Sequence, residues 1–136
     1  MNNIKKVFVI HKTHLDIGFT DSAEHVLQRY METFIPGAIK TAEICNQDGK
    51  KNFVWTVGSF LIEYYLKHGK EPQRLLEAVQ QGYISWHGLA VTTHTELMDR
   101  ELLRYDLGIS KCLDERFGRR TIAARMTDVP SHTHAM

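Results

Sequence analysis

Four short runs of β-branched and aromatic residues alternate with longer amphipathic stretches along this chain of 136 residues. The strand-like runs are residues 4–10, 53–57, 83–86 and 121–126. The stretches between them repeat apolar residues with the period of an α-helix. Such an alternation is typical of βαβ units with parallel strands. We therefore predict a single α/β domain over residues 1–136, with about four parallel strands and flanking helices, as the N-terminal part of a (β/α) barrel or as a small open sheet.

Proline and glycine residues mark where the predicted helices begin and end. Pro36 and Gly37 are expected to kink or end the first helical stretch, and Pro72 to open the helix that Gly82 ends. Gly118 ends a long helix whose predicted inner face comprises Met98, Leu102, Tyr105, Ile109, Cys112 and Leu113.

Metal-ligating side chains follow two of the strand-like runs. His14 and Asp16 come after the first run, and residues two apart on a strand point the same way. Asp128 follows the fourth run, and the carboxyl ends of parallel strands meet at one edge of a sheet. One imidazole and two carboxylates suit zinc, or a harder ion such as manganese. The alternative interpretation is that both carboxylates cap turns and His14 is a hydrogen-bonded core histidine.

Histidines occur at three further places. Trp86 and His87 end the third strand-like run, where they are either sugar contacts or a core residue beside a surface histidine. His94 lies in the following loop, either as a substrate contact or as a loop residue. His132 and His134 are either an accessory metal pair or part of a frayed terminus.

Composition argues against several partners. The formal net charge is +1 and no basic stripe is present, so we expect no nucleic-acid partner. No apolar run approaches the length of a membrane span, so we expect no membrane partner. Cys45 and Cys112 occupy apolar helical positions, which predicts reduced core residues in a cytoplasmic protein. Nucleotide-binding loops, a serine-hydrolase elbow and a Cys-x-x-Cys motif are missing from the sequence.

Three motifs, in order, resemble the start of the catalytic domain of glycoside hydrolase family 38, the α-mannosidase family. Residues 11–19, His-Lys-Thr-His-Leu-Asp-Ile-Gly-Phe, are similar to its His-(Ser/Thr)-His-x-Asp-x-Gly-Trp signature. Residues 81–88, Gln-Gly-Tyr-Ile-Ser-Trp-His-Gly, resemble its glycine-rich strand ending in tryptophan. Residues 125–132, Arg-Met-Thr-Asp-Val-Pro-Ser-His, resemble its Asp-Pro-Phe-Gly-His motif. The resemblance spans almost the whole chain and extends to bacterial mannosidase-like proteins.

The resemblance implies a retaining, α-mannosidase-like hydrolysis of a carbohydrate substrate with a divalent metal, above all zinc. It makes His14, Asp16 and Asp128 metal ligands, and it makes Asp128 the catalytic nucleophile as well. Phe19 takes the place of an aromatic residue that lines the sugar subsite. The chain departs from the signature at Lys12, which stands where the family has its first histidine.

The resemblance also implies that the acid/base carboxylate, a further metal ligand and the remaining strands lie beyond Met136. We therefore expect residues 1–136 alone not to turn over substrate, and the free sheet edge to pair with a second copy in a homo-oligomer. Two other functions remain open. One is a metal-dependent carbohydrate deacetylase or related amidohydrolase, which also uses His and Asp at strand ends. The other is a non-catalytic α/β module.

Overall fold

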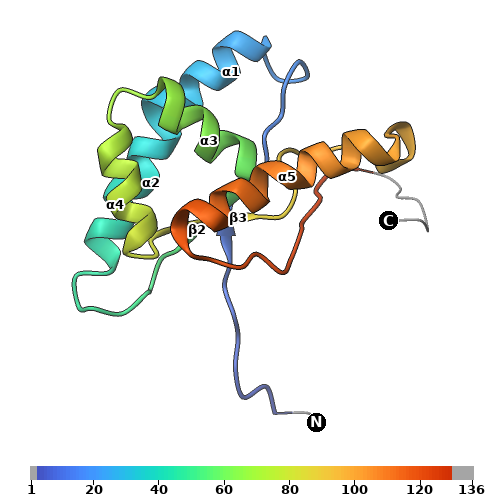
Figure 1. Cartoon of the computed structure of the whole chain (residues 1–136). Helices are drawn as coiled ribbons and strands as arrows, with labels where there is room; N and C mark the ends of the chain where they lie inside the picture. Colours follow the sequence, from blue (N-terminus) through green and yellow to red (C-terminus); the bar gives the residue numbers. More distant parts are fainter. Residues whose placement is uncertain (1–2, 130–136) are drawn as a thin grey trace.

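The structure, a computed structural model, describes residues 3–129 and has a mixed α/β fold (Figure 1). Parallel strands form an open sheet in the order β1-β2-β3, comprising β1 His11–Lys12, β2 Trp55–Gly58 and β3 Ile84–His87. The helical elements are α1 Ala23–Arg29, the π-helical turn η1 Tyr30–Phe34, α2 Ile35–Cys45, α3 Ser59–His68, α4 Pro72–Gln80, the 3₁₀ turn η2 Thr95–Leu97 and α5 Arg100–Phe117. The predicted parallel α/β arrangement is confirmed at this level. His132 and His134 lie outside the described residues.

The hydrophobic core lies between one face of the sheet and the helices. Burial alternates along β2 and β3, so that every second side chain points into the core. The residues that are at most 1% exposed come from strands and helices alike and include Ile35, Ile39, Val57, Leu61, Ile62, Leu75 and Ile84. The opposite face of the sheet, which carries Thr56 and Ser85, is only partly covered.

The first helical stretch is continuous through Pro36, where we predicted a kink or an end. Residues 23–45 form one run in which the π-helical turn η1 joins α1 to α2. Pro36 lies in the first turn of α2. A proline ring clashes with the carbonyl group four residues earlier, and the widened π-helical turn lies at that position.

The strand predicted over residues 4–10 is wrong. Ile4, Val7, Phe8, Val9 and Ile10 are 65–83% exposed, and this segment extends away from the body of the fold (Figure 1). β1 is limited to its two residues, which pair with the start of β2. Residues 4–10 have the composition of a strand, but no neighbouring strand among the described residues extends far enough to pair with them.

The fourth predicted strand, residues 121–126, is also wrong, although the segment runs beside β3. The Gly88 amide donates to the Ala123 carbonyl group over 2.8 Å, but residues 122–125 are exposed and no strand is formed there. The amide of Thr121 donates instead to the carboxylate of Asp114 on α5. Because this amide donates to a side chain, it is not available for a hydrogen bond to a neighbouring strand.

α5 ends as predicted at Gly118, whose φ of +62° is left-handed. Of the predicted inner face, Leu113 is buried and Ile109 is partly buried, but the other helix residues of that face are exposed. Leu102 and Tyr105 are 50% and 72% exposed, while the buried residues of α5 are Asp106, Ser110 and Leu113.

Cys45 and Cys112 are exposed rather than in the core. Within residues 3–129, none of the helices has both the length and the apolar character needed to cross a membrane.

Candidate functional site

A pocket of about 580 Å³ lies beyond the carboxyl end of β1. Its walls are the stretch that follows β1, the loop that follows β3, and residues 127–129. This volume lies within the usual range for small-molecule sites. The pocket is lined by five of the predicted site residues, namely His14, Asp16, Phe19, His94 and Asp128.

Trp86 and His87, the two other predicted substrate contacts, are not brought to this pocket. Trp86 is 4% exposed and belongs to the hydrophobic core. Its indole Nε1 donates to the Asp114 carboxylate over 3.0 Å. His87 is half-buried and lines a separate cavity.

Two of the residues that line the pocket beyond β1, His14 and Asp128, are in contact with each other. The distance from His14 Nε2 to Asp128 Oδ2 is 3.3 Å, and the two side chains are 36% and 79% exposed. Asp128 has a φ of +60°, in the left-handed region that non-glycine residues seldom occupy. Backbone conformations of this kind are concentrated at functional sites. Because its side chain is 79% exposed, the Asp128 carboxylate remains accessible to a ligand while it contacts the His14 imidazole.

Tyr30 holds the backbone of His14 in place. Its hydroxyl group, on the π-helical turn η1, donates to the His14 carbonyl group over 2.8 Å. Burial raises the pKa of Tyr30, so the hydroxyl group stays protonated and remains a donor. The sequence indicated Tyr30 only as a core residue, because nothing in its helical spacing shows that its polar end reaches the first motif.

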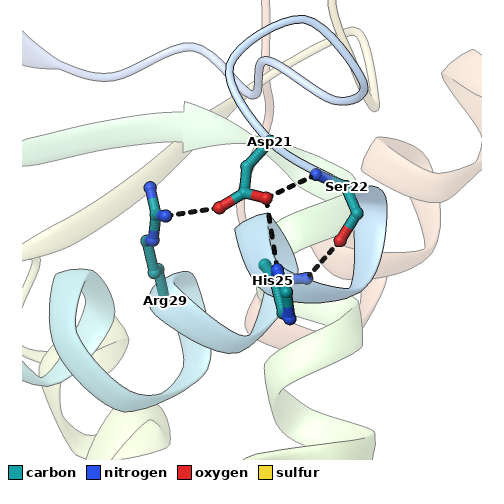
Figure 2. Close-up of polar contacts among 4 residues, drawn as sticks. All are labelled: Asp21, Ser22, His25 and Arg29. Carbon is teal, nitrogen blue, oxygen red and sulfur yellow. Dashed lines mark hydrogen bonds and ion pairs between the residues drawn. The ribbon is translucent and has the colours of Figure 1, made fainter.

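The far end of the same motif is anchored to the start of α1, as Figure 2 shows. Asp21 accepts hydrogen bonds from the Ser22 amide, from the His25 ring and from the Arg29 guanidinium group. The Ser22 hydroxyl group caps α1 by accepting from the His25 amide over 3.3 Å. These bonds, that of the Ser22 amide above all, lower the pKa of Asp21. The loop that bears Asp16 and Phe19 is therefore fixed to one helical run at both ends.

The wall formed by the loop after β3 is held close to the end of β2. A Cβ atom at Gly58 would lie 2.3 Å from the Ala90 carbonyl oxygen, so only glycine fits there without a backbone shift. The amides of Ser59 and Phe60 donate to this loop. From the other side, the Ala90 amide donates to the buried Asp106 carboxylate over 3.2 Å. Burial raises the pKa of Asp106.

His14 and Asp128 are placed so that they could share a metal ion. Two donors on one tetrahedral zinc, each roughly 2.1 Å from the metal, lie roughly 3.4 Å apart, which is close to the separation found here. Asp16 lines the same pocket. Within residues 3–129, however, no three His, Cys, Asp or Glu side chains are close enough together to form a metal site. The residue types fit zinc, and so does the spacing of the His14–Asp128 pair. Asp16, the third candidate ligand, is not close enough to this pair to form a three-ligand site in this structure.

Phe19 and His94 complete the polar and aromatic lining of the pocket. Phe19 is 91% exposed, which is unusual for an aromatic side chain of this size. His94 Nδ1 lies 3.6 Å from the Glu96 carboxylate. The apolar lining residues, which include Phe19, Val91 and Val129, surround a few polar groups, the composition expected of a ligand site.

Comparison of the chain with protein families, with curated proteins and with solved structures found no match. The case for a function therefore depends on the motifs of the chain and on the geometry of this pocket.

Proposed function

We propose that this chain is the N-terminal part of the catalytic domain of a metal-dependent, retaining glycoside hydrolase similar to the α-mannosidases. The observation that carries the proposal is the 3.3 Å approach of His14 Nε2 to Asp128 Oδ2. These residues belong to motifs near opposite ends of the chain, and both motifs resemble the same enzyme family. They meet at a pocket that Asp16 and the exposed Phe19 also line.

Asp128 is the proposed nucleophile. Its carboxylate is 79% exposed at the pocket, so a substrate can reach it without displacing core residues. In a retaining mechanism such a carboxylate attacks the anomeric carbon and forms a glycosyl ester, which water then hydrolyses. A second carboxylic acid must protonate the leaving oxygen, and we assign that role to no residue of this chain.

His14, Asp16 and Asp128 are the residues that would hold the metal. Zinc would supply a positive charge that binds sugar hydroxyl groups. The role of His14 follows from its position: Tyr30 fixes its backbone, and its Nε2 atom points toward Asp128. To join them, the Asp16 side chain would have to turn toward His14 and Asp128. The residues of its loop are exposed or partly exposed, so no core packing opposes this movement.

Phe19 and His94 are the proposed substrate contacts. An exposed aromatic ring at the edge of a pocket offers an apolar face against which the C–H face of a sugar can pack. His94 supplies a polar ring on the opposite wall, from the loop after β3. A carbohydrate, with one apolar face and hydroxyl groups at its edge, matches this combination.

The proposal extends the fold to the first part of a (β/α) barrel. Support comes from the parallel order β1-β2-β3, in which each strand lies beside the next in the sequence. The segment of residues 121–126 runs beside β3, where a fourth barrel strand would lie. The candidate pocket lies beyond the carboxyl end of β1, which is the end where barrel enzymes bind substrates.

The proposed function is tested by product analysis with the complete natural polypeptide that contains these residues. With zinc present, we expect release of nitrophenol from 4-nitrophenyl α-mannoside and no release of acetate from an acetylated sugar. Acetate release without glycoside cleavage would instead identify a deacetylase. If neither product forms and no sugar binds, the chain is a non-catalytic module and the proposal is wrong.

A further inference from the structure

A second cavity, of about 470 Å³, lies over the face of the sheet that the core helices leave partly uncovered. The strand register aligns Lys12 with Thr56 and Thr56 with Ser85, so these three side chains form one row on that face. All three line the cavity, and residues 119–125 form its other wall. We refer to it as the sheet-face cavity.

The lining of the sheet-face cavity is strongly cationic. It contains no Asp or Glu among the described residues and four basic side chains, namely Lys12, Arg119, Arg120 and Arg125. The whole chain has a formal net charge of only +1, so this is a local concentration of positive charge.

Two carboxylates outside the cavity, Asp114 and Asp128, interact with its cations and have other contacts as well. Asp114 accepts hydrogen bonds from Trp86 Nε1 and from the amide and hydroxyl group of Thr121. Asp128 is paired with His14 in the first pocket. Neither carboxylate lines the sheet-face cavity, although from outside it Asp114 attracts the charge of Arg119 and Asp128 attracts that of Lys12.

Two of the four cations have structural partners and two have free donors. Lys12 donates to the Thr127 hydroxyl group, and Arg119 donates to the Ser85 hydroxyl group over 2.8 Å and stacks on Trp86. Arg120 and Arg125 have no hydrogen bond and no carboxylate partner within residues 3–129. Their guanidinium groups are free to bind a ligand.

His87 also lines this cavity. Its Nδ1 atom is buried and has no hydrogen-bond partner in the described part of the chain. Burial lowers the pKa of His87, and the positive charges of Lys12 and Arg125 lower it further. A buried polar atom without a partner is unfavourable. Because this atom has almost no accessible surface, it is not counted among the ligand contacts.

We propose that the sheet-face cavity binds a phosphate group, either as inorganic phosphate or as part of a small phosphate ester. Guanidinium groups bind phosphate through paired N–H donors, and the cavity presents two of them without partners, beside an additional lysine. A cavity of this size holds a hexose phosphate. None of the residues that carry the proposal is a proposed catalytic or metal-binding residue. The two proposals do compete for one surface, because in a complete (β/α) barrel the sheet face that bears Lys12, Thr56 and Ser85 would face the barrel interior.

The test is calorimetric titration of the 136-residue chain in phosphate-free buffer at low ionic strength. The probes are inorganic phosphate, glucose 6-phosphate and glucose. We expect saturable binding of at least one phosphate compound and none of glucose. Arg125→Gln should weaken binding by about tenfold or more, since it removes a charge-assisted contact. Arg120→Gln provides an independent second variant.

The matched control is Arg104→Gln, which removes another exposed arginine, one that pairs with Glu101 on α5. It should change the affinity by less than about twofold, as expected for a distant surface charge. Binding of inorganic phosphate would identify the free ion as a ligand, and binding of glucose 6-phosphate alone would identify an ester. The proposal is overturned if the folded chain binds neither compound, or if Arg104→Gln weakens binding as much as Arg125→Gln does.

Discussion

Asp128→Asn is expected to lower kcat for glycoside cleavage by about a thousandfold or more. The neutral amide cannot form the glycosyl ester that a retaining mechanism requires. Because the Asp128 side chain is 79% exposed and its ion-pair partner His14 is partly exposed, the substitution removes no core packing. The loss should therefore appear in kcat, with the thermal stability of the protein unchanged. The measurement is steady-state hydrolysis of an aryl α-mannoside by the complete natural polypeptide.

The control for this prediction is Glu115→Gln, which neutralises an exposed carboxylate on α5 whose contact is Lys111 at 3.9 Å. It should leave kcat unchanged. Substantial turnover by a correctly folded Asp128→Asn protein would show that Asp128 is not the nucleophile. It would leave the turn-capping interpretation of this residue in place.

Trp86→Ala is expected to lower the free energy of unfolding by about 3–5 kcal/mol. Trp86 is 4% exposed, its ring lies 5.6 Å from that of Phe117, and the Arg119 guanidinium group stacks on it at 4.5 Å. Removing the indole leaves a cavity in the core and an Asp114 carboxylate that has lost one of its donors. Urea denaturation of the 136-residue chain, followed by circular dichroism, measures the change.

Trp86→Phe is the matched control, because it keeps an aromatic ring in the core and removes only the indole hydrogen bond and part of the volume. It should be clearly less destabilising than Trp86→Ala. The sequence alone also allowed Trp86 to be a substrate contact. In that case Trp86→Ala would weaken sugar binding and leave the unfolding midpoint unchanged, which would contradict the packing described here.

The central part of the fold was predictable because local signals agree there. Strand-like composition, helical periodicity, Pro72 and Gly118 together indicate β2, β3 and the helices around them. The two outer strands were mispredicted because a strand needs a partner, and composition does not show whether one is present. Residues 4–10 have no neighbour to pair with among the described residues, and Thr121 donates its amide to Asp114.

Part of the face that α5 buries was mispredicted for a related reason. The periodicity favoured the side of the helix that carries Leu102 and Tyr105, yet both of these side chains are exposed. The buried side carries Asp106, whose carboxylate accepts the Ala90 amide. This buried side therefore includes a hydrogen bond to a distant loop, and no local pattern of apolar residues encodes such a contact.

At the site, the sequence indicated which residues would gather but not how they are supported. His14, Asp16 and Asp128 were expected at one edge of a parallel sheet, and all three line one pocket. The hydrogen bond from Tyr30 and the close approach of Gly58 to Ala90 arise from tertiary packing. The sheet-face cavity was not anticipated, because its cations become neighbours only when residues 119–125 turn back along β3 (Figure 1).

The central claim is that His14 and Asp128 hold a divalent metal at the pocket beyond β1. It is tested most directly by calorimetric titration of the 136-residue chain, purified without chelators or tags, with zinc. We predict saturable binding at one site that is lost in His14→Ala and retained in His68→Ala, which replaces an exposed histidine on α3. Absence of zinc binding, or zinc binding that survives His14→Ala, would contradict the claim.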